Sequence, residues 1–158
     1  MLTIGEEIKQ SKFKSEYQKA LLNILLTANT LYASNNRFLK SYGLSPEQYN
    51  VLRILRGQFP EPSSVLNIQE RMLDKMSNAS RLVDKLEVKK LLTRKQCAAD
   101  RRQVEVTITE EGIKLLQAID EPFQELENKL SCISAEELDN FNDILDKIRH
   151  VYREHVKS

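Results

Sequence analysis

The stretch from Ser77 to Thr109 constrains the fold more than any other part of the sequence. Its first part, with Ser77 as the expected N-cap, places apolar residues on one side of a helix and polar or basic residues on the other. Two short strands are expected after it. In the second, Val104–Ile108, apolar and polar residues alternate with the period of a half-buried strand. The connection between the strands, residues 96–103, is polar and basic. We therefore expect a short amphipathic helix that leads directly into a charged β-hairpin.

A second short helix is predicted just before this unit, from Ser63 or Ser64 to Met72, with its apolar residues pointing inward. About four residues join the two helices, which is the spacing of a helix-turn-helix motif. The chain has only four glycines and four prolines, and this composition favours helices. We predict a mainly α fold with a small two-stranded β-wing, that is, a winged helix-turn-helix plus a helical dimerisation region.

The two ends of the chain are expected to form long helices with excess apolar surface. Residues 14–40 carry apolar side chains on more than one side of a helix, so this helix needs more than one buried face. In a chain of 158 residues the additional partner is expected to be a second subunit. We predict that residues 1–40 and 110–158 form the dimerisation region and that residues 41–109 form a DNA-binding domain.

Short local signals mark several helix ends. Gly43 suits a left-handed helix end, and Ser45–Pro46 is an N-cap followed by proline at the first helical position. Thr109 is a further N-cap, and Ser134–Glu137 is a capping box. Pro122 lies inside the span of the helix that follows Thr109, and we expect it to kink or divide that helix.

Charge is distributed unevenly along the chain, although the net charge is only +1. Residues 71–103 contain ten basic and four acidic residues, a balance of +6. Residues 105–145 contain two basic and eleven acidic residues, a balance of −9. One region attracts phosphate and the next repels it, which would orient the protein on a polyanion. The alternative is two solvated surfaces of opposite sign.

Three segments resemble the MarR family of bacterial transcriptional regulators, in that family's order and spacing. LSPEQYNVL at Leu44–Leu52 is similar to its LSxxQYxVL helix start, and SNASRLVDKL at Ser77–Leu86 is similar to its recognition helix. Asp100–Arg102, followed by Val104–Thr109 and Gly112, is similar to its DxR wing signature and L-T-x-x-G segment. The resemblance extends from about residue 21 to about residue 149.

Two departures from the family pattern matter. Lys90 stands where the family often has glycine at the end of the recognition helix, which leaves a different turn open as an alternative. The first long helix contains no cysteine, so the mechanism of the family's peroxide-sensing branch is not carried over.

The resemblance and the geometry of a helix in the major groove together predict the DNA contacts. Residues at the N-terminal end and outer face of such a helix reach base edges, and flanking cations meet phosphate. The DNA-binding residues expected on this basis are Ser77, Asn78, Ser80, Arg81, Lys85, Lys89, Arg94, Lys95, Arg101 and Arg102. We expect Arg81 to contact a guanine, Arg102 to enter an A·T-rich minor groove, and Asp100 to orient the wing tip. The alternative for each is a solvated side chain.

Membership of this family would imply a homodimer on a pseudo-palindromic operator of double-stranded DNA. A repressor is the default expectation, although the family also contains activators. Relatives bind small, often aromatic or anionic ligands between the dimerisation region and the DNA-binding domain. Tyr32, Phe38, Tyr42 and Tyr49 are candidates to line such a pocket, and the commoner alternative is that they belong to the core.

Other classes of function find little support in the sequence. His150 and His155 are the only histidines, and there is no Gly-rich phosphate loop, nucleophile motif or metal-ligand spacing, so no enzyme, cofactor or metal is expected. Cys97 and Cys132 are too few for a disulfide framework, and a redox role for Cys97 beside Lys95 is a minor alternative.

No apolar run approaches the ~20 residues that cross a bilayer, and there is no signal-peptide core, so no membrane partner and a cytoplasmic location are expected. A helical protein-interaction module without DNA binding remains the alternative function.

Overall fold

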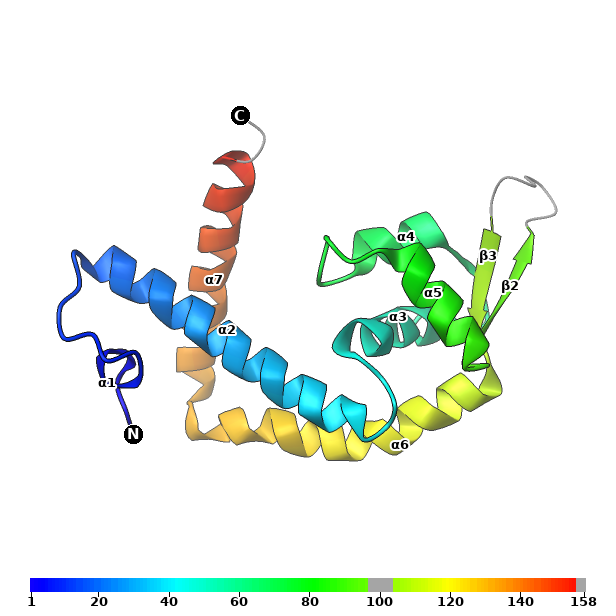
Figure 1. The fold of residues 1–158 in the computed structure, drawn as a ribbon, viewed down its shortest axis with the longest axis horizontal. Helices are drawn as coiled ribbons and strands as arrows, with labels where there is room; N and C mark the ends of the chain where they lie inside the picture. Colours follow the sequence, from blue (N-terminus) through cyan, green and yellow to red (C-terminus); the bar gives the residue numbers. More distant parts are fainter. Residues whose placement is uncertain (97–103, 156–158) are drawn as a thin grey trace. The chain divides into compact units, whose positions relative to one another are not determined.

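The computed structural model describes residues 1–96 and 104–155 of the chain (Figure 1). The helices are α1 (Ile4–Glu7), α2 (Glu16–Lys40), α3 (Pro46–Arg56), α4 (Val65–Arg71), α5 (Ala79–Val88), α6 (Glu110–Glu127) and α7 (Ala135–His155). The strands are β1 (Ser63–Ser64), β2 (Leu92–Gln96) and β3 (Val104–Ile108). The chain divides into two compact units, Met1–Gln117 and Ala118–Ser158, with the boundary inside α6. The prediction of a mainly α fold with a small sheet is confirmed.

The core of the first unit lies where α3, α4 and α5 meet the sheet. Each of these helices turns an apolar side inward, as its sequence spacing predicts. The side chains that are almost completely buried include Leu52 and Leu55 of α3, Ile68 of α4, Val83 and Leu86 of α5, Leu92 of β2 and Val106 of β3. Burying a side chain of this size stabilises the fold by about 1.5–3 kcal/mol. This core holds α5 against the sheet.

The helix ends of the first unit follow the local signals. Gly43 has a φ of +70°, in the left-handed region. The Ser45 hydroxyl accepts a hydrogen bond from the Gln48 amide, and the Gln48 side chain accepts one from the Ser45 amide, both at 3.2 Å. Ser64 caps α4 by accepting a hydrogen bond from the Asn67 amide at 3.1 Å. The short helix α1 was not predicted, because four residues are too few to show helical periodicity.

The sheet has three antiparallel strands in the order β1-β3-β2, not two as predicted. β2 and β3 form the predicted hairpin, with Leu92 opposite Ile108 and Gln96 opposite Val104. β1 adds Ser63 and Ser64 to the other edge of β3. The prediction missed β1 because a two-residue strand has no alternation of its own and exists only through its pairing with β3.

The two helices that follow the sheet start where the sequence indicates. The Thr109 hydroxyl accepts a hydrogen bond from the Gly112 amide at 3.1 Å, which caps α6. Ser134 and Glu137 form the predicted capping box at the start of α7. Pro122 does not divide α6, which continues to Glu127, because the loss of one backbone donor leaves the neighbouring turns intact. Within the described residues, no helix combines the length and the apolar character needed to cross a membrane.

Candidate nucleic-acid interface

The N-terminal end of α5 is fixed by a cap and by the turn before it. Asn78, not Ser77, is the N-cap, because the Asn78 side chain accepts a hydrogen bond from the Arg81 amide at 3.0 Å. The Ser77 hydroxyl instead donates to the Asp74 carboxylate at 2.6 Å. The expected cap was therefore placed one residue too early. Asn78 was predicted to read bases, but its side-chain oxygen is committed to the helix.

The outer surface of α5 presents polar and basic side chains to solvent. Ser80, Arg81 and Lys85 are exposed, and neither Arg81 nor Lys85 forms an ion pair within the described residues. Both line an open hollow of about 650 Å³ that also includes Ser77 and Asn78. The structure thus brings together four of the predicted contact residues at one end of the helix, and Lys85 lies one turn further along.

Lys89 is exposed, but its ammonium group forms hydrogen bonds within the protein. Its ammonium nitrogen lies 2.5 Å from the carbonyl oxygen of Gly43 and 2.9 Å from the side-chain oxygen of Gln48. Two of its three donors are therefore used to tie the end of α5 to the turn between α2 and α3. In this structure the ammonium group joins the end of α5 to the turn before α3, and the predicted contact of Lys89 with phosphate stays a prediction.

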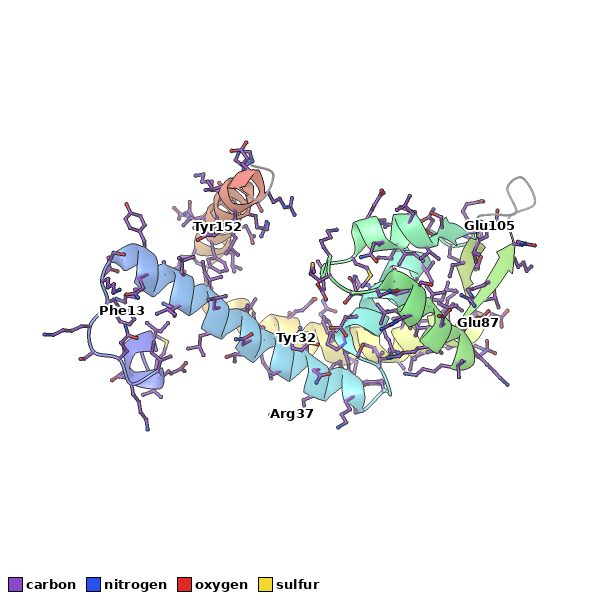
Figure 2. All side chains as sticks on the ribbon, turned by 45° about the horizontal axis from the view of Figure 1, so that its top comes forward. Phe13, Tyr32, Arg37, Glu87, Glu105 and Tyr152 are labelled. Carbon is purple, nitrogen blue, oxygen red and sulfur yellow. The ribbon has the colours of Figure 1, made fainter. Side chains whose placement is uncertain are left out.

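Arg94 is also committed to an internal contact. Its guanidinium contacts the carboxylates of Asp84 at 2.6 Å and Glu87 at 2.9 Å, so a residue of β2 is joined to two residues of α5. Figure 2 labels Glu87 on α5. In this structure two carboxylates contact the one guanidinium, and the predicted contact of Arg94 with phosphate stays a prediction. Asp84 and Glu87 lie three residues apart on one face of α5, so both carboxylates reach the same guanidinium.

The turn between α5 and β2 is left-handed despite the lysine. Lys90 has a φ of +62°, and the Leu91 amide donates to the Leu86 carbonyl at 3.1 Å, as in a glycine-ended helix. The Lys90 carbonyl accepts a hydrogen bond from the Thr109 hydroxyl at 2.8 Å. The alternative of a different turn is therefore wrong. Thr109, which also caps α6, helps to hold Lys90 in this conformation.

The wing is described only in part. Lys95 is exposed on β2 and stands opposite Glu105 of β3 in the strand register. Asp100, Arg101 and Arg102, with Cys97, lie outside the described residues, so their predicted roles stay predictions.

The four aromatic residues predicted to line a ligand pocket have different surroundings. Tyr49 is buried in the core, and its hydroxyl accepts a hydrogen bond from the Arg53 guanidinium at 2.9 Å. The rings of Phe38 and Tyr42 lie 5.4 Å apart and are tilted by 53°. Tyr32 is exposed on α2 (Figure 2). Its hydroxyl donates to the Glu47 carboxylate at 2.8 Å.

The hydrogen bond between Tyr32 and Glu47 shifts the pKa of both side chains. Burial raises the pKa of Glu47, but hydrogen bonds from Ser45 and Tyr32 outweigh burial and hold this pKa below its ordinary value. The hydrogen bond to Glu47, followed by burial, raises the pKa of the Tyr32 hydroxyl. The ionised carboxylate and neutral phenol therefore form the stable pair that joins α2 to α3.

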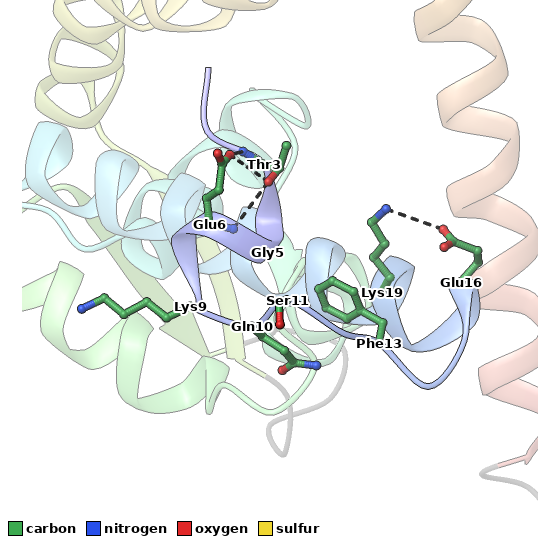
Figure 3. Close-up of a pocket in the computed structure, with 9 residues that line it drawn as sticks. All are labelled: Thr3, Gly5, Glu6, Lys9, Gln10, Ser11, Phe13, Glu16 and Lys19. Carbon is green, nitrogen blue, oxygen red and sulfur yellow. Dashed lines mark hydrogen bonds and ion pairs between the residues drawn. The ribbon is translucent and has the colours of Figure 1, made fainter.

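A second hollow, of about 730 Å³, lies at the N-terminus, between α1 and the start of α2 (Figure 3). Its charged groups are partly engaged locally. The Glu6 carboxylate accepts hydrogen bonds from Thr3, and Lys19 lies 3.8 Å from Glu16 and 6.0 Å from the Phe13 ring centre. These contacts explain how the N-terminal segment folds onto α2, and they do not resemble an anion site.

Comparisons with known proteins agree with this geometry. The model of the MarR family matches residues 44–104. The HTH-type transcriptional regulator MhqR of Bacillus subtilis (strain 168) is 32% identical over 114 residues, which are 72% of this chain and 77% of that protein. Such relatives are transcriptional regulators rather than enzymes.

Two solved structures share the fold. The complex of S. aureus MepR with DNA is similar with a TM-score of 0.72 and 23% identity, over 83% of this chain and 94% of that chain. The organohalide-sensing transcriptional regulator RdhR, in its 2,4-dichlorophenol-bound form, is similar with a TM-score of 0.76 and 20% identity, over 89% and 86% of the two chains.

Proposed function

The chain belongs to the MarR family of transcriptional regulators, and from this premise we propose that it binds a pseudo-palindromic operator as a homodimer and represses transcription by occluding the promoter. The proposal assigns it no catalytic activity. The observation that carries it is the exposed end of α5, where Arg81 and Lys85 lie without ion-pair partners among the described residues beside the capped N-terminus. A helix end of this kind favours contact with base edges and phosphates.

The proposed roles of the basic residues differ from one another. Arg81 and Ser80 are proposed to reach base edges, and Lys85 to meet phosphate, with the Ser77 backbone amide at the helix start. Lys89 and Arg94 are proposed to position α5 and the wing instead of meeting DNA, because each already uses two of its donors in contacts within the protein. Arg102, oriented by Asp100, is proposed to enter the minor groove on the strength of the family resemblance.

The test begins with selection of bound duplexes from a random pool, read by sequencing. We expect a pseudo-palindrome whose half-site centres are about 10 bp apart. On that duplex, measured by fluorescence anisotropy, Arg81→Ala should weaken binding by about 1–3 kcal/mol. Lys114→Ala is the matched control, because Lys114 is an exposed lysine of α6 with the same change in charge.

Equal losses for Arg81→Ala and Lys114→Ala would contradict a specific role for α5. An affinity that does not fall steeply with added salt would contradict contact with phosphates altogether. For the wing, Arg102→Ala should lose affinity mainly on operators with A·T-rich flanks. Full affinity of that variant on such a duplex would remove Arg102 from the proposal.

Dimerisation is proposed to use the exposed apolar residues of the two long terminal helices. On α2 these are Tyr17, Leu21, Leu25 and Leu31, and on α7 they are Phe141, Ile144, Val151 and Tyr152. Monomeric proteins rarely leave so many large apolar side chains in water on two helices. Residues 1–40 and 110–158 are therefore proposed as the dimerisation region, and residues 41–109 as the DNA-binding domain.

We further propose that a small aromatic ligand releases the protein from DNA. Of the four aromatic candidates, Tyr32 is the one whose side chain is mostly exposed and whose hydroxyl joins α2 to α3. The dichlorophenol-bound relative supports a phenol-like ligand. Titration of the protein–operator complex with 2,4-dichlorophenol as the probe should lower the anisotropy. Tyr32→Phe should change the midpoint of that titration if the ligand binds beside this tyrosine.

A further inference from the structure

Two large apolar side chains stand in solvent beside the start of α5. Met76 is 93% exposed and Leu66 of α4 is 68% exposed. Both line one open hollow of about 590 Å³, together with Ser77, Asn78 and Ser80. Met76 also lines the neighbouring hollow that contains Arg81 and Lys85. The apolar pair therefore lies among the residues proposed to meet DNA.

Met76 lies in a turn whose backbone is held by several hydrogen bonds. The Met76 amide donates to the Asp74 carboxylate at 2.9 Å, and the Ser77 hydroxyl donates to the same group at 2.6 Å. The Gln69 side chain spans the turn, because its oxygen accepts from the Ala79 amide at 3.0 Å and its nitrogen donates to the Lys75 carbonyl at 3.2 Å. Hydrogen bonds thus hold the backbone on both sides of Met76, while its side chain is 93% exposed. Such pre-organised apolar exposure is typical of a binding surface.

The surroundings of the pair indicate what covers it. Arg81 and Lys85, the cations of the adjoining hollow, favour a polyanion over an apolar protein surface. Within the major groove, the apolar group that bases display is the 5-methyl group of thymine. We infer that Met76, with Leu66 beside it, contacts thymine methyl groups in the major groove and thereby selects A·T pairs at positions next to those contacted by Arg81. This inference rests on the proposed function and assigns a further specificity-determining residue to it.

The test removes the methyl group without changing base pairing. In the operator selected from the random pool, each thymine is replaced in turn by uracil, and affinity is measured by fluorescence anisotropy. Loss of one buried methyl group should weaken binding by the wild-type protein about three- to four-fold at one or two positions in each half-site. Met76→Gln, which keeps the length but not the apolar character, should bind the thymine and uracil duplexes equally at those positions.

Two further variants complete the design. Met76→Leu should retain the preference for thymine, because it keeps an apolar side chain of similar size. Leu73→Ala is the matched control, since Leu73 is 87% exposed in the same turn but does not line either hollow, and it should leave the thymine preference unchanged. Thermal unfolding followed by circular dichroism checks that each variant is folded.

The outcomes separate this inference from the proposed function. Wild-type protein that binds a duplex but does not distinguish thymine from uracil at any position overturns the role of Met76 alone. The same conclusion follows if Met76→Gln keeps the full thymine preference. A chain that selects no duplex from the pool overturns the proposed function, and the inference fails with it.

Discussion

Lys90 adopts a backbone conformation that side-chain-bearing residues rarely occupy. Lys90 lies between α5 and β2 with a φ of +62°, where the Cβ atom of a non-glycine residue is sterically unfavourable. We predict that Lys90→Gly raises the free energy of unfolding by about 1 kcal/mol, measured by urea denaturation. Lys114→Gly, the same change within the exposed surface of α6, should lower it by about 1 kcal/mol. A loss of stability in both variants would mean that Lys90 is not strained.

Gly112 is required for a different reason, the close approach of α6 to the turn after α5. A Cβ atom at this position would lie 2.3 Å from the Leu91 carbonyl oxygen and 2.7 Å from Cγ1 of Ile108. Because the nearest atom is backbone, Gly112→Ala should destabilise the protein by about 3 kcal/mol or more in urea denaturation. Gly57→Ala is the matched control, since its Cβ would meet nothing closer than 3.5 Å and its φ is −68°. That variant should be neutral or slightly stabilising, and similar losses in both would contradict the steric explanation.

Single residues also show where the sequence was and was not sufficient. Thr109 was predicted as a cap because the signal needs only the next three residues. Asn78 and Ser77 exchanged roles because Asp74, within the turn, competes for the serine hydroxyl. The contacts of Lys89 with Gly43 and Gln48 were not predicted, because these residues lie far away in the sequence and no local pattern reveals such a contact.

At the scale of the elements, the ion pairs between α5 and β2 can be tested for their role in DNA binding. Arg94 of β2 is paired with Asp84 and Glu87 of α5, so it sets the position of the strand against the helix. We predict that Arg94→Ala weakens operator binding several-fold but leaves the slope of log affinity against log salt unchanged, because no phosphate contact is lost. Lys85→Ala should instead reduce that slope by about 1.

The comparison of the two slopes decides between positioning and direct contact. If Arg94→Ala reduced the slope as Lys85→Ala does, Arg94 would leave its carboxylate partners to meet phosphate in the complex. A double-mutant cycle with Asp84→Asn provides an independent check, since residues in one ion-pair network show coupled effects. Independent, additive losses would contradict the tie.

The contact between α2 and α3 predicts a dependence on pH. The pKa of Glu47 is lower in the folded protein than in the unfolded chain, so the ionised carboxylate contributes stability above the ordinary glutamate pKa of about 4.3. This contribution is lost as the pH falls through the lower, folded value. In urea denaturation from pH 7 to pH 3, Glu47→Gln should therefore flatten the acid loss of stability. Glu61→Gln, an exposed glutamate of the same unit, should leave the profile as in the wild type.

Helices and strands that are specified by nearby residues were predicted, and those that depend on distant residues were not. α3, α6 and α7 begin at the predicted caps, because an N-cap is defined within one turn of helix. β2 and β3 were predicted because alternation is visible along one strand. β1 could not be predicted, since Ser63 and Ser64 become a strand only against β3. The ion pairs of Arg94 could not be predicted for the same reason, because an ion pair between a strand and a helix is a tertiary property.

For the whole molecule, the exposed apolar residues of the terminal helices predict the state of assembly. Leu25 of α2 is 59% exposed and Ile144 of α7 is 52% exposed, and each belongs to a row of similarly exposed apolar side chains. We predict that the wild-type protein is a dimer at micromolar concentration in analytical ultracentrifugation. Leu25→Glu and Ile144→Glu should each shift it toward monomer, because a buried, unpaired carboxylate is costly at an interface.

The control for assembly uses an apolar residue that is equally exposed but lies elsewhere. Leu73→Glu changes a side chain in the turn before α5, which is 87% exposed, and the variant should remain a dimer. Because a pseudo-palindrome is bound through two half-sites, the monomeric variants should also bind a full operator little better than a single half-site. A wild-type monomer, or monomeric variants that keep full operator affinity, would show that α2 and α7 bury their apolar residues in some other way.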